Sequence, residues 1–396
     1  MKRPVRVLEL RSATGPGGGP EKTILAGAAT HDPRAFAVTV CYLRNQSDED
    51  DSISARARAA GVKFVTIPER HSFDLGTWRA LKRLVDEHAI DIVHAHDHKS
   101  DLLALCLAKA TGVVPLSTAH GWTGHSRRER YVYYPADRKL LTRFPHVVAV
   151  SSEIRARLVE AGAHPLRVST ILNGIDHRKF RRDPARREAT RRALGLDPSD
   201  LVIGSFGRLE PQKRYDILID VCASLSRRAE LCGAPTGKPA LDGPPQLKLL
   251  IAGDGSLMPA LTAQAAQLMP ENARMLGHRA DVADVMSAFD VFVQSSDYEG
   301  TPNAVLEAMA VETPVVATTA GGTAELLTDA VHGLLVPCGN PSALRTAIER
   351  TIADPAATAH RVAAARARVE RELSFEQRMK HLEAVYERMY ACASSS

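Results

Sequence analysis

Two glutamates with seven residues between them lie in the segment SSDYEGTPNAVLEAMA (295–310). An apolar strand should end where this segment starts, and we expect Thr301 to cap a helix that begins at Pro302. Glu299 then precedes the helix N-terminus and Glu307 lies inside the helix, with backbone N–H groups between them that suit a phosphate-like ligand. Two carboxylates placed in this way can bind vicinal hydroxyl groups, such as those of a sugar ring. The alternative is a helix with an ordinary capping acid.

Two basic residues, Arg208 and Lys213, follow another predicted strand in the segment GSFGRLEPQKRYDILIDV (204–221). An arginine can bind two oxygens of a pyrophosphate at once, and a lysine adds a point charge. Positive charge held here would stabilise a departing nucleoside diphosphate, a role that metal ions fill elsewhere. The alternative is a pair of basic side chains that face solvent.

Glycine-rich turns follow predicted strands at two places. The turn ATGPGGGPEKT (13–23) opens a helix and would let the backbone approach a ligand closely. It differs from the Rossmann fingerprint because Pro20 stands where the last glycine would fall, and from a P-loop because no Gly-Lys-Ser/Thr follows. The second turn is TAGGTAEL (319–326).

Two further clusters resemble metal sites. His94, His96 and His98 alternate in DIVHAHDHKSD and would share one face of a strand, but zinc ligands are usually more widely separated. We therefore expect polar residues at a strand end near an acceptor instead. Asp48 and Asp50 form an Asp-x-Asp pair in a polar loop without a matching strand. We expect no metal and no cofactor.

Basic and loop-like segments complete the set of candidates. Arg127, Arg128 and Arg130 precede a group of tyrosines and form either a solvated face or a contact with an anionic membrane or lipid diphosphate. The basic segment 177–200 is expected to link two domains as a solvated helix and connector, and the Gly- and Pro-rich segment 227–246 to form a surface loop.

Short apolar runs alternate with longer amphipathic ones, and this alternation occurs in two separate series along the chain. The first series of predicted strands covers 5–10, 37–43, 63–68, 91–96, 114–120 and 146–151, with helices near 20–30, 76–88 and 100–110. The second series covers 201–209, 247–255, 273–278, 291–296, 313–319 and 332–337. Such alternation predicts two α/β domains with parallel, doubly wound sheets, which bind ligands at the carboxyl ends of their strands.

The composition agrees with a protein of two domains. The chain has 396 residues, 44% of them hydrophobic, and a formal net charge of +5, which suits phosphate-bearing ligands but is too weak to indicate nucleic acid binding. Six scattered cysteines without a C-x-x-C pair indicate free thiols in a reducing compartment. No apolar run is long enough to span a bilayer, so we expect a cytoplasmic protein.

The motifs together resemble those of the retaining glycosyltransferases of family 4, in particular members that act in bacterial polysaccharide biosynthesis. The matching segments follow the family's order over most of the chain: GGGPEKT (17–23), AHGW (119–122), LNGID (172–176), GRLEPQKR (207–214), IAGDG (251–255), GHRADV (277–282), the two glutamates, and AGGTAEL (320–326). The resemblance implies the GT-B fold, two Rossmann-like domains that face each other across a cleft. Residues 1–176 would form the acceptor domain, 177–374 the donor domain, and 375–396 would pack back on the first.

The resemblance also implies a role for each matching residue. Arg208 and Lys213 would hold the donor diphosphate, Glu307 the ribose, and Glu299 and His120 the transferred sugar. Further donor contacts would come from Gly18, Gly19, Gly253, His278, Arg279, Gly300, Thr301, Pro302 and Asn303. Thr301 stands where relatives more often have an aromatic or bulky residue, which leaves the identity of the sugar open.

The expected reaction is transfer of a sugar from a UDP- or GDP-sugar to a glycan or polyprenyl-diphosphate-linked acceptor, beside the inner membrane. Retention of the anomeric configuration follows from the resemblance alone. A nucleotide-sugar epimerase or a phosphorylase on the same fold, and a non-catalytic nucleotide-sugar binding protein, are the alternatives. A dehydrogenase fits less well because the first glycine turn lacks the dinucleotide fingerprint.

Overall fold

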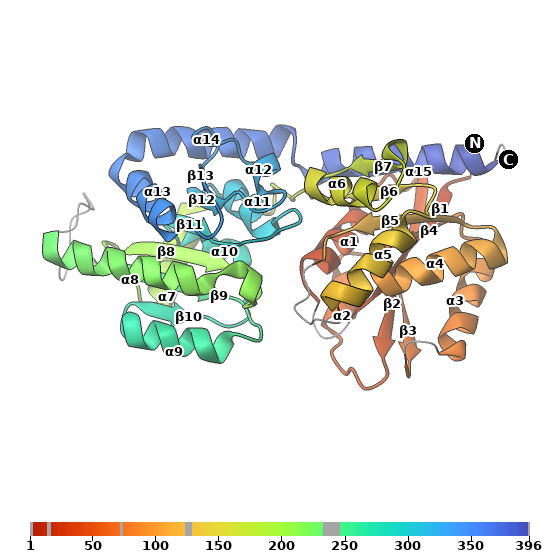
Figure 1. Ribbon diagram of the computed structural model, residues 1–396, viewed down its shortest axis with the longest axis horizontal. Helices are drawn as coiled ribbons and strands as arrows, with labels where there is room; N and C mark the ends of the chain where they lie inside the picture. Colours follow the sequence, from red (N-terminus) through yellow and green to blue (C-terminus); the bar gives the residue numbers. More distant parts are fainter. Residues whose placement is uncertain (1–2, 14–16, 72–73, 123–128, 233–245, 395–396) are drawn as a thin grey trace. The chain divides into compact units, whose positions relative to one another are not determined.

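The computed structural model describes residues 3–13, 17–71, 74–122, 129–232 and 246–394. The chain divides into two compact units (Figure 1). Unit 1 comprises Met1–Gly174 and Phe375–Ser396, and unit 2 comprises Ile175–Ser374. The division therefore falls two residues before the expected boundary, and the chain returns to unit 1 with its last helix.

The described part of unit 1 contains a parallel sheet of seven strands. They are β1 (Val5–Ser12), β2 (Phe36–Asn45), β3 (Lys63–Glu69), β4 (Ile92–Ala95), β5 (Val114–Ala119), β6 (Val147–Ala149) and β7 (Val168–Thr170), in the order β3-β2-β1-β4-β5-β6-β7. All but β7 match the predicted strands. The three-residue strand β7 follows a single 3-10 turn at the edge of the sheet and carries too short an apolar run to predict.

Helices cover both faces of this sheet, because successive strand residues point to opposite sides. The helices are α1 (Gly19–Thr30), α2 (Ser52–Ala59), α3 (Leu75–Glu87), α4 (His98–Thr111), α5 (Tyr134–Leu141), α6 (Ser152–Glu160) and α15 (Phe375–Ser394), with a π-helical turn at Glu129–Tyr133 and a 3-10 turn at Pro165–Arg167. Leu8 and Leu10 of β1 pack with α3, α4, α5 and α6, whereas Val5 and Val7 pack with α15. The C-terminal helix thus completes the core of unit 1.

The described part of unit 2 has a parallel sheet of six strands. They are β8 (Leu201–Phe206), β9 (Leu247–Ala252), β10 (Ala273–Met275), β11 (Val291–Gln294), β12 (Val315–Thr318) and β13 (Leu334–Val336), in the order β10-β9-β8-β11-β12-β13. The helices are α7 (Pro184–Ala193), α8 (Tyr215–Cys232), α9 (Met258–Leu268), α10 (Val282–Ser287), α11 (Asn303–Ala310), α12 (Thr323–Leu326), α13 (Pro341–Ala353) and α14 (Pro355–Arg371), with a 3-10 turn at Pro211–Lys213. Helices α8, α9 and α13 bury one face of the sheet.

Both sheets reverse their strand order at one point, between β1 and β4 in unit 1 and between β8 and β11 in unit 2. At such a point the turns that follow neighbouring strands diverge, which leaves room for a ligand at the carboxyl ends. The turns that carry Lys213 and Glu299 in unit 2, and the strand that carries His94 in unit 1, lie beside these two points.

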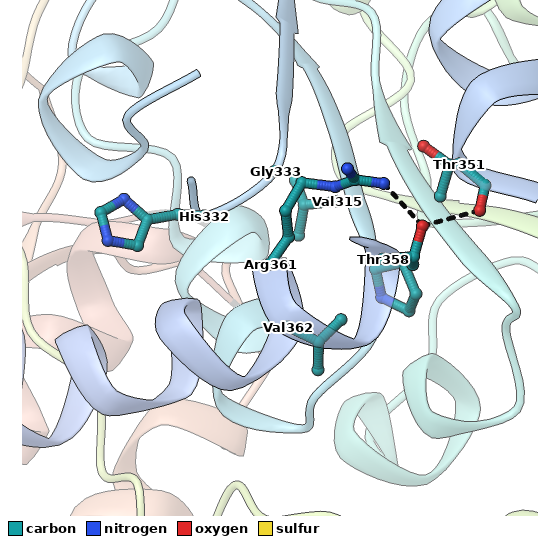
Figure 2. Close-up of a pocket in the computed structure, with 8 residues that line it drawn as sticks. Val315, His332, Gly333, Thr351, Thr358, Arg361 and Val362 are labelled. Atoms are coloured by element: carbon teal, nitrogen blue, oxygen red, sulfur yellow. Dashed lines mark hydrogen bonds between the residues drawn. The ribbon is translucent and has the colours of Figure 1, made fainter. Parts of the chain in front are cut away.

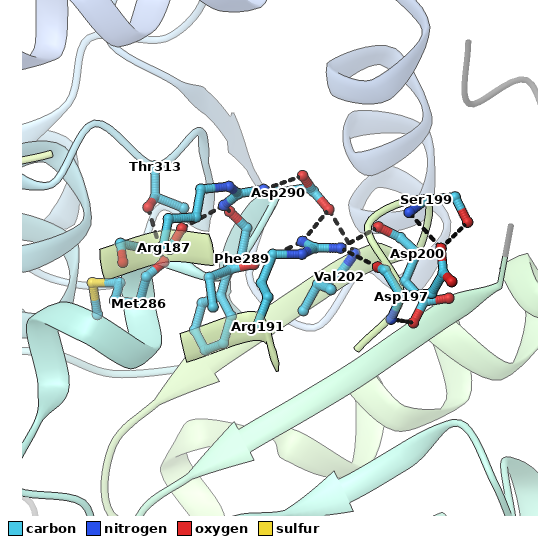
Figure 3. A network of polar contacts seen from close by, with 12 residues as sticks. Arg187, Arg191, Asp197, Ser199, Asp200, Val202, Met286, Phe289, Asp290 and Thr313 are labelled. Atoms are coloured by element: carbon cyan, nitrogen blue, oxygen red, sulfur yellow. Dashed lines mark hydrogen bonds and ion pairs between the residues drawn. The ribbon is translucent and has the colours of Figure 1, made fainter. Parts of the chain in front are cut away.

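The basic segment 177–200 is part of unit 2, and the expectation that its arginines are solvated is wrong for two of them (Figure 3). Arg187 and Arg191 of α7 bind Asp290 at 2.7 and 3.2 Å, and Asp290 also accepts from the backbone N–H of Val202. Arg191 donates further to the carbonyls of Ala288 (3.0 Å), Asp197 (3.0 Å) and Asp200 (2.7 Å). These contacts fasten α7 beneath the amino ends of β8 and β11, so the arginines stabilise the fold.

A small crevice in unit 2 lies at the joint between α13 and α14 (Figure 2). Arg361 donates to the hydroxyl of Thr358 at 2.6 Å, and that hydroxyl donates to the carbonyl of Thr351 at 2.8 Å. The second bond joins α14 to α13, whereas the first lies within α14, and the crevice lies away from the carboxyl ends of β8 and β11. We therefore assign it a structural role.

The remaining expectations have mixed outcomes. The segment 227–246 is only partly a loop, because α8 continues to Cys232, and 233–245 lie outside the described residues. Within the described part of the chain, Cys41, Cys106, Cys222 and Cys338 are free thiols. Among the described helices, none is long and apolar enough to cross a membrane.

Candidate functional site in unit 2

The turn after β8 carries both predicted basic residues. Arg208 is exposed, and Lys213 ends the 3-10 turn Pro211–Lys213 that leads into α8. The neighbouring turn after β9 approaches closely, since a Cβ atom on Gly253 would lie 1.8 Å from the carbonyl oxygen of Gly207. Gly253 also has a φ of +144°, so both the close approach and the backbone conformation require glycine here.

The turn after β11 is held against the turn after β8 by hydrogen bonds to backbone carbonyls. The hydroxyl of Ser295 donates to the carbonyls of Lys213 and Arg214, at 2.8 and 3.0 Å. The backbone N–H of Asp297 donates to the carbonyl of Gln212 at 2.8 Å. These three bonds cross the point where the strand order reverses, so they fix the two motif segments relative to each other.

The side chains of Lys213 and Glu299 meet at this crossing. The ammonium Nζ lies 2.6 Å from Oε1 of Glu299, and the hydroxyl of Ser296 donates to the same oxygen at 2.6 Å. Both charged side chains are largely buried, with 16% and 10% of their surfaces exposed. An ammonium has three donors, so Lys213 can bind an anionic ligand without giving up Glu299.

The helix of the two-glutamate segment begins one residue later than predicted. Pro302 is the N-cap of α11, with an extended φ of −74° and ψ of 105°, and its carbonyl accepts from Val305 at 3.1 Å. The prediction that Thr301 caps the helix is therefore wrong, because the chain is still extended at Pro302. Glu307 lies in the second turn of α11 and is buried, as is Thr301.

The second glycine turn supports the backbone of Glu299. A Cβ atom on Gly321 would lie 1.8 Å from the carbonyl oxygen of Glu299, and the φ of Gly321 is +50°. The N–H of Gly322 donates to the carbonyl of Gly300 at 2.8 Å. The sequence showed that this turn follows a strand and opens a helix, but not that it holds Glu299 and Gly300.

His278 and Arg279 follow the edge strand β10. The N–H of Gly253 donates to the carbonyl of Gly277 at 2.8 Å, which joins this turn to the one after β9. Arg279 pairs with Asp281 at 2.5 Å, and His278 is exposed. Unit 2 thus gathers its predicted residues along the carboxyl edge of β10, β9, β8 and β11.

Candidate functional residues in unit 1

The first glycine turn of unit 1 is held by a buried carboxylate that the sequence did not single out. Glu21 accepts from the N–H of Gly18 at 2.5 Å and pairs with Arg11 at 2.6 Å. Burial raises the pKa of Glu21, but Arg11 and the N–H of Gly18 outweigh burial, and the pKa lies below its usual range. Gly18 is the N-cap and Gly19 the first residue of α1.

The predicted histidine cluster is divided by the structure. His98 is not on the strand, because β4 ends at Ala95 and α4 begins at His98, whose ring stacks on Tyr133. His94 and His96 instead meet Glu9 of β1, and the ligand atoms of the three groups lie within 4.8 Å of one another. This set could hold a metal by its chemistry, but hydrogen bonds already use its ring nitrogens and carboxylate oxygens.

The remaining unit 1 candidates have structural partners or lie outside the described part. Asp48 pairs with Arg44 at 2.7 Å, and Asp50 accepts from the N–H of Ser52 at 2.8 Å, so this pair caps a local turn. Arg127 and Arg128 lie outside the described residues. His120 follows β5 and contacts His96 at 3.1 Å.

Comparison with solved structures identifies the fold. The crystal structure of HepE from Anabaena in complex with UDP and glucose has a TM-score of 0.81 and 22% identity, and it covers 97% of this chain and 100% of that chain. Sucrose-phosphate synthase from Thermosynechococcus elongatus has a TM-score of 0.79 and 20% identity over 98% and 100% of the two chains. The two doubly wound units therefore form a GT-B fold.

Comparison of the sequence places the chain in a family. The family model described as Glycosyltransferase Family 4 matches residues 17–179, and the model described as Glycosyl transferases group 1 matches residues 186–368. The lipopolysaccharide core biosynthesis mannosyltransferase LpsB of Rhizobium meliloti (strain 1021) is 30% identical over 255 residues, 63% of this chain and 67% of LpsB. The UDP-Gal:alpha-D-GlcNAc-diphosphoundecaprenol alpha-1,3-galactosyltransferase of Escherichia coli is 26% identical over 294 residues, 71% of each chain. The chain belongs to glycosyltransferase family 4 and is a glycosyltransferase.

Proposed function

We propose that the enzyme transfers a sugar from a UDP-sugar, bound by unit 2, to a glycan or polyprenyl-diphosphate-linked acceptor, with retention of the anomeric configuration. The observation that carries this proposal is the contact between Lys213 and Glu299, which puts a cation and a hydroxyl-binding carboxylate side by side. A nucleotide sugar has a diphosphate directly bonded to a sugar, so it needs these two groups in adjacent positions.

We assign the nucleotide part of the donor to the other predicted residues at the carboxyl edge of the sheet in unit 2. Arg208 and Lys213 would bind the diphosphate, and the exposed side chain of Arg208 is accessible to such a ligand. Glu307 would accept from the ribose hydroxyls, and His278 and Arg279 would lie beside the base, with Gly253 between them and the phosphates. The remaining sugar and phosphate contacts are assigned to Gly300, Thr301, Pro302 and Asn303.

The choice of UDP is supported by two relatives. HepE was crystallised in complex with UDP and glucose, and the Escherichia coli relative uses UDP-Gal. From unit 1, we assign His120 to the transferred sugar, and Gly18 and Gly19 to the diphosphate.

The proposed reaction breaks the bond between the anomeric carbon and the diphosphate and forms a bond from that carbon to the acceptor oxygen. The leaving phosphate oxygen takes the proton of the acceptor hydroxyl, and the acceptor attacks from the same face. Lys213 and Arg208 stabilise the negative charge that develops on the leaving UDP. Neither glutamate acts as a nucleophile, and we propose that no metal is required.

The acceptor is proposed to be a lipid-linked or free glycan in surface polysaccharide biosynthesis. The Escherichia coli relative acts on a GlcNAc linked to diphosphoundecaprenol, and LpsB acts in lipopolysaccharide core biosynthesis. A net charge of +5 suits an acceptor that carries a diphosphate and a contact with an anionic membrane surface.

Thermal unfolding in the presence of nucleotide sugars tests the donor site. A ligand at about 100 times its Kd stabilises the native state by about 2.7 kcal/mol, and UDP-sugars should do this with or without EDTA. GDP-, ADP- and TDP-sugars serve as the comparison. Glu307→Ala should abolish the shift, whereas Glu188→Ala, at an exposed glutamate of α7, should retain it. No shift with any nucleotide sugar would refute the proposal.

A further inference from the structure

Three neighbouring strands of unit 1 become polar toward their carboxyl ends on one face. On this face Val5, Val7, Ile92 and Leu116 pack against the C-terminal helix α15 in an apolar core. Two residues further along each strand the same face carries Glu9 on β1, His94 on β4 and Thr118 on β5, because alternate residues share a face. His96 and His120 continue these rows just past the ends of β4 and β5.

A chain of hydrogen bonds joins these polar residues to α15. The hydroxyl of Tyr386 donates to Oε1 of Glu9 at 2.7 Å, and Oε2 of Glu9 contacts Nε2 of His96. Nδ1 of His96 lies 3.1 Å from Nε2 of His120. Glu9, His96 and Tyr386 are buried, so this chain leads from the core of unit 1 to the half-buried ring of His120.

Burial and neighbouring charges set the charge states of Glu9, His96 and His120 in this chain of hydrogen bonds. Burial raises the pKa of Glu9, but His94 and His96 outweigh burial and the pKa lies well below its usual range, so Glu9 is an acceptor only. Burial lowers the pKa of His96 to about 4. The pKa of His120 also lies well below its usual range. Burial lowers it most, followed by His96 and the guanidinium groups of Arg11 and Arg378. Both rings are therefore neutral near pH 7.

These charge states fix which ring nitrogen of His96 and of His120 carries the proton. A carboxylate has no hydrogen to donate, so Nε2 of His96 carries the proton that binds Glu9 and Nδ1 of His96 is an acceptor. The contact from Nδ1 of His96 consequently requires a proton on Nε2 of His120. Nδ1 of His120 is left with its lone pair and has no hydrogen-bond partner among the residues that the structure describes.

We propose that Glu9 and His96 are positioning residues that hold His120 as the tautomer with its proton on Nε2, so that Nδ1 accepts a hydrogen bond from a hydroxyl of the transferred sugar. This inference rests on the proposed function, in which His120 contacts that sugar. A neutral ring with one fixed acceptor selects a hydroxyl with a defined orientation. At the opposite end of this chain of hydrogen bonds, Tyr386 holds Glu9 in place.

Nitrogen NMR on the full-length protein labelled with ¹⁵N-histidine tests the tautomer directly, because protonated and unprotonated ring nitrogens have different shifts. The His120 signals are assigned by their loss in His120→Gln. We expect one tautomer with Nε2 protonated, before any ligand is added. A ring with its proton on Nδ1, or an average of both tautomers, would overturn the inference, whatever nucleotide sugars do.

Two replacements of His96 form a matched pair. The amide of His96→Asn occupies the place of Nδ1 and can still accept from His120, whereas the amide of His96→Gln occupies the place of Nε2 and can bind only Glu9. We expect His120 to keep its tautomer in His96→Asn and to lose it in His96→Gln. The transfer rate should fall roughly 3- to 10-fold in the Gln variant relative to the Asn variant. Equal His120 spectra in the two variants would contradict the role of His96.

Addition of UDP-sugar and of UDP separates this inference from the proposed function. We expect UDP-sugar, but not UDP, to shift Nδ1 of His120. If UDP-sugar binds and stabilises the protein but leaves Nδ1 unchanged, the positioning role is refuted while the donor site stands. If no nucleotide sugar binds, the proposed function fails and the sugar-binding part of the inference fails with it, whereas the tautomer measurement is unaffected.

Discussion

The ammonium group of Lys213 lies 2.6 Å from a carboxylate oxygen of Glu299 and so joins the turns that follow β8 and β11. These strands are neighbours although β9 and β10 lie between them in the chain, because the strand order of unit 2 reverses there. The pair therefore lies where a doubly wound sheet can bind a ligand. Because Lys213 and Glu299 form an ion pair, replacing either one removes the charged partner of the other.

Replacement of Lys213 by alanine should reduce the transfer rate by about 100- to 1000-fold, the usual effect of removing one group that stabilises charge in a transition state. The physical reason is the uncompensated charge on the leaving diphosphate. Steady-state kinetics with a UDP-sugar would measure the loss. Lys179→Ala, at an exposed lysine of the same unit, is the matched control and should retain full activity. Unchanged kinetics in Lys213→Ala would remove this lysine from the site.

Alanine at Gly321 should destabilise unit 2 by more than alanine at Gly339. Both glycines have left-handed backbones, with φ of +50° and +66°, so both variants lose about 1–2 kcal/mol from strain. At Gly321 the new Cβ would also lie 1.8 Å from the carbonyl oxygen of Glu299, whereas at Gly339 the nearest atom is 4.0 Å away. Urea unfolding gives the two free energies, and donor binding should weaken only in Gly321→Ala. Equal stability of the two variants would show that the turn can relax.

Alanine at Arg191 should lower the free energy of unfolding by about 2–4 kcal/mol, because it leaves buried carbonyl groups and Asp290 with fewer partners. The neighbouring residue Arg192 is the control. Its side chain is 72% exposed and only approaches Glu188, at 3.8 Å, so its removal should cost less than about 1 kcal/mol. Denaturant unfolding of both variants would check this, and similar losses would argue against the structural role of α7.

The stability of unit 1 should depend on the titration of His146. Burial, and then the charge of Arg388, lower the pKa of His146 to about 4, and its Nε2 contacts the hydroxyl of Ser169 at 2.9 Å. Between about pH 6.5 and pH 4 the unfolded state binds a proton that the folded state does not, so stability falls as the pH falls. The slope for one such group is at most about 1.4 kcal/mol per pH unit.

The variant His146→Gln isolates this effect, because the amide can keep the contact with Ser169 but does not titrate. Other groups, such as the buried Asp101 with its raised pKa, act in both proteins and cancel in the difference. The stability of the wild type minus that of the variant should shrink as the pH falls from about 6.5 to 4. A constant difference over this range would mean that His146 titrates normally.

Much of the molecule could be predicted from local patterns. The strands of both sheets except β7 lie where apolar runs were found, and Lys213 and Glu299 lie at strand carboxyl ends as predicted. The predictions that were wrong also came from local patterns, which do not show how distant segments pack. Thr301 has the right chemistry for an N-cap, but the chain is still extended at Pro302, and a run of arginines in 177–200 gives no sign of which of them will face Asp290.

By itself, the sequence determined the alternation of strands and helices and the residue types at the strand ends, because both are encoded in periodicity and in short motifs. Only the tertiary structure decided which of those ends meet, because strand order brings together segments that are far apart in the chain. Glu9, in a run of apolar residues, becomes a buried partner of His96 and Tyr386 only when β4 and α15 pack beside β1. The contact of Gly321 with the backbone of Glu299 likewise depends on β12 lying next to β11.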